Sequence, residues 1–166
     1  MKTTDPRIPL PYFVSYTRLD KTLPTRLLER LQPHFAISQR YAFSSWQDID
    51  ILPGEDWNEK IHDALDACSL GLLLLSPGFF SKPYIVEQEI PVFLKSRKVV
   101  IPVLLKPLDL KLHNLHGLEK LQIFSLPSPS GSRAFSECTT ADQKDAFALA
   151  LYQAIERRLT KLPPTP

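Results

Sequence analysis

Glycine is scarce in this chain of 166 residues, and its scarcity argues against several common nucleotide sites. Only five glycines are present, and none forms the G-x-G-x-x-G fingerprint or a phosphate-binding P-loop. The sequence G-x-S-x-G, which marks the nucleophile of many serine hydrolases, is also missing. We therefore do not expect an oxidoreductase with the usual dinucleotide fingerprint, and any nucleotide must be held in another way.

Metal-binding patterns are missing as well. The two cysteines, Cys68 and Cys138, do not have the spacing of a metal site, and the four histidines form no H-x-x-x-H pair. We expect no metal site and two free thiols in a reducing compartment.

The chain also lacks a long apolar run and an excess of one charge. Its longest apolar run, Leu70–Leu75, is far too short to span a bilayer, and no apolar signal region follows Lys2. The net charge is only +2, without a cluster of Lys or Arg. We therefore expect a cytoplasmic protein that binds neither a membrane nor nucleic acid directly.

Strand patterns alternate with helical patterns along the chain. Strands are expected at residues 11–16, 40–46, 70–75, 99–105 and, more weakly, 121–126. Helical patterns follow at about residues 23–31, 57–68, 81–96 and 147–159. Strands joined by single helices require right-handed crossovers and a parallel sheet. We predict an α/β fold, a flavodoxin-like doubly wound five-stranded parallel sheet flanked by helices, with ligands at the carboxyl ends of its strands.

The chain has room for one domain, which we expect at residues 11–160 after an N-terminal extension at residues 1–10. Residues 161–166 end in a proline-rich tail that cannot continue a helix. We interpret the tail as the start of a linker to a sensor or oligomerisation region in the same chain. Alternatively, the domain works beside a sensor in a separate chain. A frayed natural terminus is the alternative.

Three segments, taken in order and with their spacing, resemble the Toll/interleukin-1 receptor (TIR) family, and in particular its prokaryotic members. Residues 12–16, YFVSY, are similar to the family's F-I-S-Y box on the first strand. Residues 46–57, WQDIDILPGEDW, resemble its BB loop with a P-G turn. Residues 72–84 resemble the strand and helix start that bacterial members write as L-L-S-P-x-F-x-x-S-x-Y. The resemblance covers about residues 11–105.

The resemblance implies one of two functions. Some TIR domains are scaffolds that bind other TIR domains, and others cleave NAD+ into nicotinamide and ADP-ribose or a cyclic isomer of it. The enzymatic members share a glutamate on the helix after the third strand. The family pattern of an aromatic residue followed by glutamate and an aliphatic residue matches Tyr84, Glu89 and Ile90.

Helix geometry favours the same glutamate over Glu87. With Ile85 at zero and 100° per residue, Glu89 lies at about 40° and Ile90 at about 140°, whereas Glu87 lies at about 200°. Glu89 thus falls on the apolar arc, where a carboxylate is costly unless it is paired or functional. A buried ion pair or a position at the rim of the sheet is the alternative. Pro91 is expected to kink this helix and to disfavour helical geometry at Ile90.

A lone carboxylate suits the chemistry that the resemblance implies. Nicotinamide in NAD+ is already a pyridinium and leaves as a neutral molecule, so the reaction needs no general acid, metal or cofactor. The transition state needs stabilisation of the positive charge that develops on the ribose, which a fixed carboxylate supplies. NAD+ would then be the substrate, with Glu89 as the catalytic residue.

Further candidates come from the strand ends and the BB-like loop, and they rest on the resemblance. The expected substrate-binding residues are Ser15, Tyr16, Arg18, Trp46, Asp48, Trp57, Ser76 and Tyr84. Arg18 could contact the diphosphate as a bidentate donor, or could simply be a surface charge. Trp57 could instead pack in the core, and Asp48 could only shape its loop.

The BB-like loop is the expected interface between domains, formed by Ile49, Ile51, Leu52, Pro53 and Gly54. Its apolar side chains are hard to explain on a solvated loop, and in TIR relatives this segment inserts into a neighbouring subunit. Such head-to-tail contacts extend into filaments. The alternative is that these residues fold back onto their own domain.

The resulting hypothesis is an NAD+ glycohydrolase that a sensor activates by assembling it, in bacterial antiphage immunity. The alternative is a non-catalytic scaffold for contacts between TIR domains. A phosphorelay receiver is disfavoured because the third strand ends in Leu75 and Ser76 rather than in a phosphoacceptor aspartate.

Overall fold

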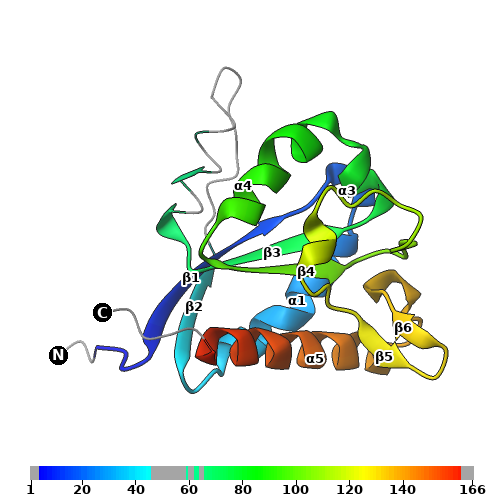
Figure 1. Cartoon of the computed structure of the whole chain (residues 1–166). Helices are drawn as coiled ribbons and strands as arrows, with labels where there is room; N and C mark the ends of the chain where they lie inside the picture. The colour runs from blue at the N-terminus through cyan, green and yellow to red at the C-terminus, as the bar shows by residue number, and fades with distance from the viewer. Residues whose placement is uncertain (1–3, 46–58, 60–61, 64–65, 162–166) are drawn as a thin grey trace.

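The computed structural model describes residues 4–45, 59, 62–63 and 66–161. Its centre is a parallel sheet in the order β2-β1-β3-β4 (Figure 1). The strands are β1 (Ile8–Ser15), β2 (Tyr41–Ser45), β3 (Leu70–Leu75) and β4 (Val99–Leu104). Every residue of β3 and β4 is buried, as expected for strands covered on both faces. The predicted α/β fold with a parallel sheet and flanking helices is confirmed.

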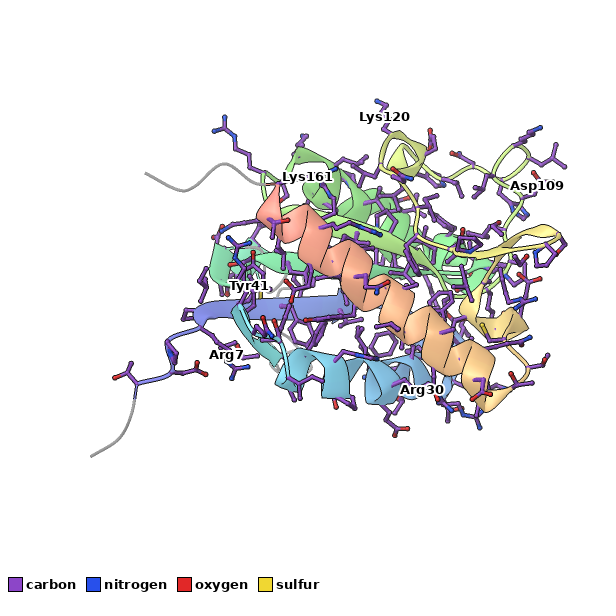
Figure 2. All side chains as sticks on the ribbon, turned by 90° about the horizontal axis from the view of Figure 1, so that it is seen from below. Arg7, Arg30, Tyr41, Asp109, Lys120 and Lys161 are labelled. Atoms are coloured by element: carbon purple, nitrogen blue, oxygen red, sulfur yellow. The ribbon has the colours of Figure 1, made fainter. Side chains whose placement is uncertain are left out.

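Helices cover both faces of the sheet (Figure 1). On one face lie α1 (Leu23–Ala36) and α5 (Ala141–Thr160), whose apolar residues pack on β1, β3 and β4. The salt bridge between Arg30 Nε and Asp145 Oδ1, 3.2 Å, joins these two helices on the side seen in Figure 2. On the other face lie α3 (Pro77–Ser81) and α4 (Ile90–Lys95), which contribute Phe79, Ile90 and Phe93 to a second core.

The prediction of a fifth strand at residues 121–126 is wrong in its extent. Only Phe124 adds to the edge of β4, through Phe124 N to Pro102 O at 2.7 Å and Leu104 N to Phe124 O at 2.8 Å. The chain then turns away, because β5 (Leu126–Ser128) pairs antiparallel with β6 (Gly131–Arg133). The described sheet therefore has four strands and one isolated bridge. Cys138 is buried in the core.

The first strand begins at Ile8, three residues before its expected start at residue 11. Residues 8–10 pair with residues 41–43 of β2, and Leu10 is buried in the core. Part of the segment expected as an N-terminal extension thus belongs to the sheet. At the other end, α5 stops at Thr160, and residues 162–166 of the expected tail lie outside the described residues.

The helix expected at residues 81–96 begins later than expected and contains a π-helical turn that runs directly into α4 (Ile90–Lys95). Ser76 caps α3, which ends at Ser81; the π-helical turn η2 (Ile85–Glu89) follows, and α4 begins at Ile90. Pro91 explains the change, since it lacks the N–H that an uninterrupted helix needs there and instead lies in the first turn of α4, where no donor is required. Ile90 keeps helical dihedral angles, so the expected loss of helical geometry at Ile90 is wrong.

No helix in the described part of the chain is long and apolar enough to cross a membrane. Nor do the described residues contain a group of three or more His, Cys, Asp and Glu side chains that could hold a metal ion.

Candidate functional site

The candidate site lies where β1, β3 and β4 end. Because the three strands are parallel neighbours, their carboxyl ends meet at one edge of the sheet. β1 ends at Ser15, and Ser76 directly follows β3. The π-helical turn η2 brings Glu89 to this edge, and π-helical turns are frequent at functional sites.

Glu89 is a buried carboxylate that the end of β1 contacts. Glu89 is only 3 % exposed, and Ser15 Oγ donates a 2.9 Å hydrogen bond to Glu89 Oε2. Burial raises the pKa of Glu89 to about 7, against the opposing effect of the hydrogen bond from Ser15. Among the described residues, no Lys or Arg forms an ion pair with it. Glu89 is therefore a buried carboxylate with a pKa near neutral pH.

Apolar packing on either side holds Glu89 in place. Ile85, Ile90 and Phe93 are all buried, as the helical pattern predicts, whereas Glu87 is exposed. The prediction that Glu89 rather than Glu87 faces the core is thus confirmed, although this turn is π-helical and not α-helical.

An aromatic stack joins β1 and α4 in the second core. The rings of Phe13 and Phe93 stack with their centroids 5.6 Å apart. Gly71 of β3 makes room for this stack, because a Cβ at that position would lie 2.6 Å from Phe13 Cζ. The glycine is thus required by a close approach within the second core.

The other residues predicted to bind substrate differ in their exposure to solvent. Tyr16 and Tyr84 are 43 % and 38 % exposed, and Arg18 is exposed on the short helix η1 (Arg18–Asp20). Ser76 is fully buried: its hydroxyl accepts from Phe79 N at 3.0 Å and donates to Asp20 Oδ2 at 2.7 Å. This hydroxyl is occupied by protein groups, so the expected direct contact of Ser76 with a substrate does not fit the geometry.

Several predicted residues lie outside the described residues. They are Trp46, Asp48 and Trp57 of the expected substrate site and Ile49, Ile51, Leu52, Pro53 and Gly54 of the expected interface.

Asp20 is a functional candidate that sequence reasoning missed. Asp20 is buried, and its carboxylate contacts Ser76 Oγ and Lys106 Nζ. The available signal was an acidic residue in the segment between the first strand and the first helix. Its partners could not be identified, because they come from the ends of other strands.

We expect Ser15→Ala to raise the pKa of Glu89 further. The substitution removes the hydrogen bond that lowers this pKa, while the burial that raises it stays. An NMR titration of the Glu89 carboxyl carbon measures the shift, with Ser44→Ala, an exposed serine on β2, as the control. An unchanged pKa in Ser15→Ala would show that the hydroxyl does not act on the carboxylate.

Comparison with known proteins agrees with this architecture. A family model described as a TIR domain matches residues 13–139. The crystal structure of the TIR domain of the Toll-related receptor TRR-2 from Hydra magnipapillata is similar, with a TM-score of 0.57 and 17 % sequence identity over 87 % of this chain and 97 % of that chain. At this level of identity the likeness shows the fold alone. No match was found among curated proteins.

Proposed function

Since this chain belongs to the TIR domain family, we propose that it is an NAD+ glycohydrolase that cleaves the bond between nicotinamide and ribose. The products would be nicotinamide and ADP-ribose, or a cyclic isomer of ADP-ribose. The observation that carries the proposal is Glu89, a carboxylate 3 % exposed near the carboxyl end of β1, with a hydroxyl as its hydrogen-bond partner. A scaffold needs no such costly group.

The proposed reaction uses the carboxylate as a fixed negative charge. The bond between C1′ of the ribose and the pyridinium nitrogen breaks, its electron pair goes to the nitrogen, and neutral nicotinamide leaves. Positive charge develops on the ribose, and ionised Glu89 stabilises it in surroundings that water does not screen. Water then adds to C1′ and loses a proton, or a group of the same substrate adds to give the cyclic product.

Residues around Glu89 are proposed to bind the rest of the substrate. Ser15 orients the carboxylate, and the exposed Tyr16, Tyr84 and Arg18 are proposed to contact the nicotinamide ribose and the diphosphate. Trp46, Asp48 and Trp57 stay candidates on sequence grounds. Ser76 is proposed to support the loop after β1 through its hydrogen bond to Asp20, and not to contact the substrate.

Nicotinamide release from NAD+ by concentrated purified protein tests the function directly. Release above the rate of a heat-denatured sample is the expected result. If no nicotinamide appears at any protein concentration while the domain still self-associates, the alternative of a non-catalytic scaffold is favoured.

We further propose that assembly switches the activity on, with other TIR domains as partners and a sensor in the same or another chain as the trigger. We propose bacterial antiphage immunity as the setting of this switch, on the family resemblance alone. Specific activity is then expected to rise with protein concentration, because head-to-tail contacts through residues 49–54 would complete the substrate cleft.

Light scattering and nicotinamide release, measured over the same concentration series, check this expectation. Ile51→Asp and Leu52→Asp should suppress both the rise in activity and the growth in particle size, whereas Ile37→Asp changes an equally apolar side chain that is 78 % exposed on the described surface and serves as the control. Equal specific activity in dilute and concentrated samples would rule out assembly as the switch.

A further inference from the structure

We propose that Asp20 is a positioning residue of this site, which locks the segment between β1 and α1 against the ends of β3 and β4. That segment carries Tyr16 and Arg18, so the lock determines where these side chains can meet a substrate. The kinetic part of the inference rests on the proposed NAD+ cleavage, whereas the lock itself does not.

The lock consists of two contacts from one buried carboxylate. Asp20 is 4 % exposed; its Oδ2 accepts a 2.7 Å hydrogen bond from Ser76 Oγ, and its Oδ1 lies 3.4 Å from Lys106 Nζ. Ser76 follows β3, and Lys106 follows β4 and donates its own backbone N–H to Leu75 O at 3.2 Å. A single side chain thus connects the loop after β1 with the ends of two neighbouring strands.

Close packing around η1 indicates that this loop has little freedom. Gly78 of α3 faces it, since a Cβ there would lie 3.3 Å from Leu19 Cβ and 3.4 Å from Thr17 Cγ2. Thr17 is buried, and its Oγ1 accepts from Leu19 N at 3.3 Å to begin η1. The loop is therefore held from the side of α3 as well as through Asp20.

Backbone strain directly after Asp20 also indicates that this loop is held in place. Lys21 has φ of 58° and ψ of −119°, a conformation that costs a residue with a side chain and persists only where the surroundings impose it. The Asp20 contacts with Ser76 and Lys106 are such surroundings. Strain of this kind gathers at ligand sites, where the exact course of the backbone matters.

Charge explains why an aspartate is required rather than a neutral residue. Burial of a carboxylate is costly, and the Lys106 ammonium offsets this cost while keeping its own contact with water, since its side chain is 39 % exposed. The lock therefore depends on charge pairing as well as on shape. Glu89 differs, because within the described part of the chain its contact is a hydroxyl and no Lys or Arg forms an ion pair with it.

Loss of the lock should affect substrate binding more than the chemical step. Ser15 lies within the ladder of β1 and β3, opposite Leu73, so its contact with Glu89 does not depend on the loop. Tyr16 and Arg18 lie beyond the ladder and would sample other positions. Only the fraction of molecules with a correctly placed loop would then bind substrate tightly, which raises KM without lowering kcat.

Asp20→Asn and Lys106→Met test the proposal. Asn keeps an acceptor for Ser76 but lacks the charge that Lys106 needs, and Met keeps the length of the lysine side chain without its charge. Each variant is expected to raise KM for NAD+ about 5- to 20-fold and to leave kcat within about 2-fold. The double variant should add little to either one, because both remove the same contact. Lys111→Met, the same change at an exposed lysine, is the control and should leave KM unchanged.

Hydrogen exchange of the backbone amides of residues 16–21 is the second readout, and it needs no NAD+. In both variants these amides should exchange at least about 10-fold faster than in the unmodified protein, while the amides of β3 and β4 stay protected. Unchanged or uniformly faster exchange would overturn the lock. Faster loop exchange with an unchanged KM, or a lower kcat at constant KM, would overturn its link to the substrate.

These two readouts separate the lock from the proposed function. If the unmodified protein releases no nicotinamide, the proposed function fails, and hydrogen exchange still decides whether Asp20 holds the loop. If Asp20→Asn does not fold, Lys106→Met carries the test, since it changes a partly exposed side chain.

Discussion

Glu89→Gln is expected to lower the rate of NAD+ cleavage by roughly 10³-fold, while the folded structure is kept. Glutamine has the shape of glutamate and can still accept the hydrogen bond from Ser15, but it has no negative charge to stabilise the developing cation. The loss should therefore fall on kcat rather than on KM. Nicotinamide release measures the rate, and circular dichroism with a thermal melt checks the fold.

Glu87→Gln is the matched control for this prediction. It makes the same chemical change two positions earlier on η2, at an exposed side chain. Its activity should stay within about 2-fold of the unmodified protein, as for most surface substitutions away from a site. Full activity in folded Glu89→Gln would remove Glu89 from the mechanism, and a loss confined to Glu87→Gln would assign the catalytic carboxylate to that position.

As the pH rises, the free energy of unfolding is expected to fall while the rate of NAD+ cleavage rises. The pKa of Glu89 is about 7 in the folded protein, against 4.5 for an unperturbed glutamate, because burial disfavours the charged form. A carboxyl group with a raised folded pKa contributes stability that is complete below about pH 4.5 and is lost as the pH rises through 7. Relative to Glu89→Gln, the unmodified protein should therefore lose about 3 kcal/mol of unfolding free energy between pH 4 and pH 8.

Urea unfolding of both proteins across this range measures the difference. The gap between their unfolding free energies should widen as the pH rises, and Glu87→Gln should follow the unmodified protein throughout. NAD+ cleavage should increase over the same range, because the ionised carboxylate is the active form. Parallel stability curves for Glu89→Gln and the unmodified protein would mean that Glu89 is not held in an apolar environment, and the electrostatic basis of the proposed reaction would fail with it.

Much of the fold could be predicted because it rests on local patterns. The six apolar residues of Leu70–Leu75 predict a strand buried on both faces, and the structure contains it with the same bounds. The fifth strand could not be judged this way, since the pattern near Phe124 is strand-like and only the hairpin of β5 and β6 shows where the chain leaves the sheet. Pro91 predicts a disturbed helix, but not that the disturbance is a π-helical turn ending at Glu89.

What the sequence determined by itself was the alternation of strands and helices, the parallel sheet and the choice of Glu89 over Glu87, because each follows from the spacing of residues a few positions apart. Only the tertiary structure decided which groups meet at the site. Ser15 and Glu89 are 74 residues apart, and Asp20 and Ser76 are 56 apart, so their contacts depend on the order of the strands and on the register between them. Both the raised pKa of Glu89 and the pairing of Asp20 with Lys106 arise from burial that no local pattern specifies, since burial depends on what the rest of the chain packs against each side chain.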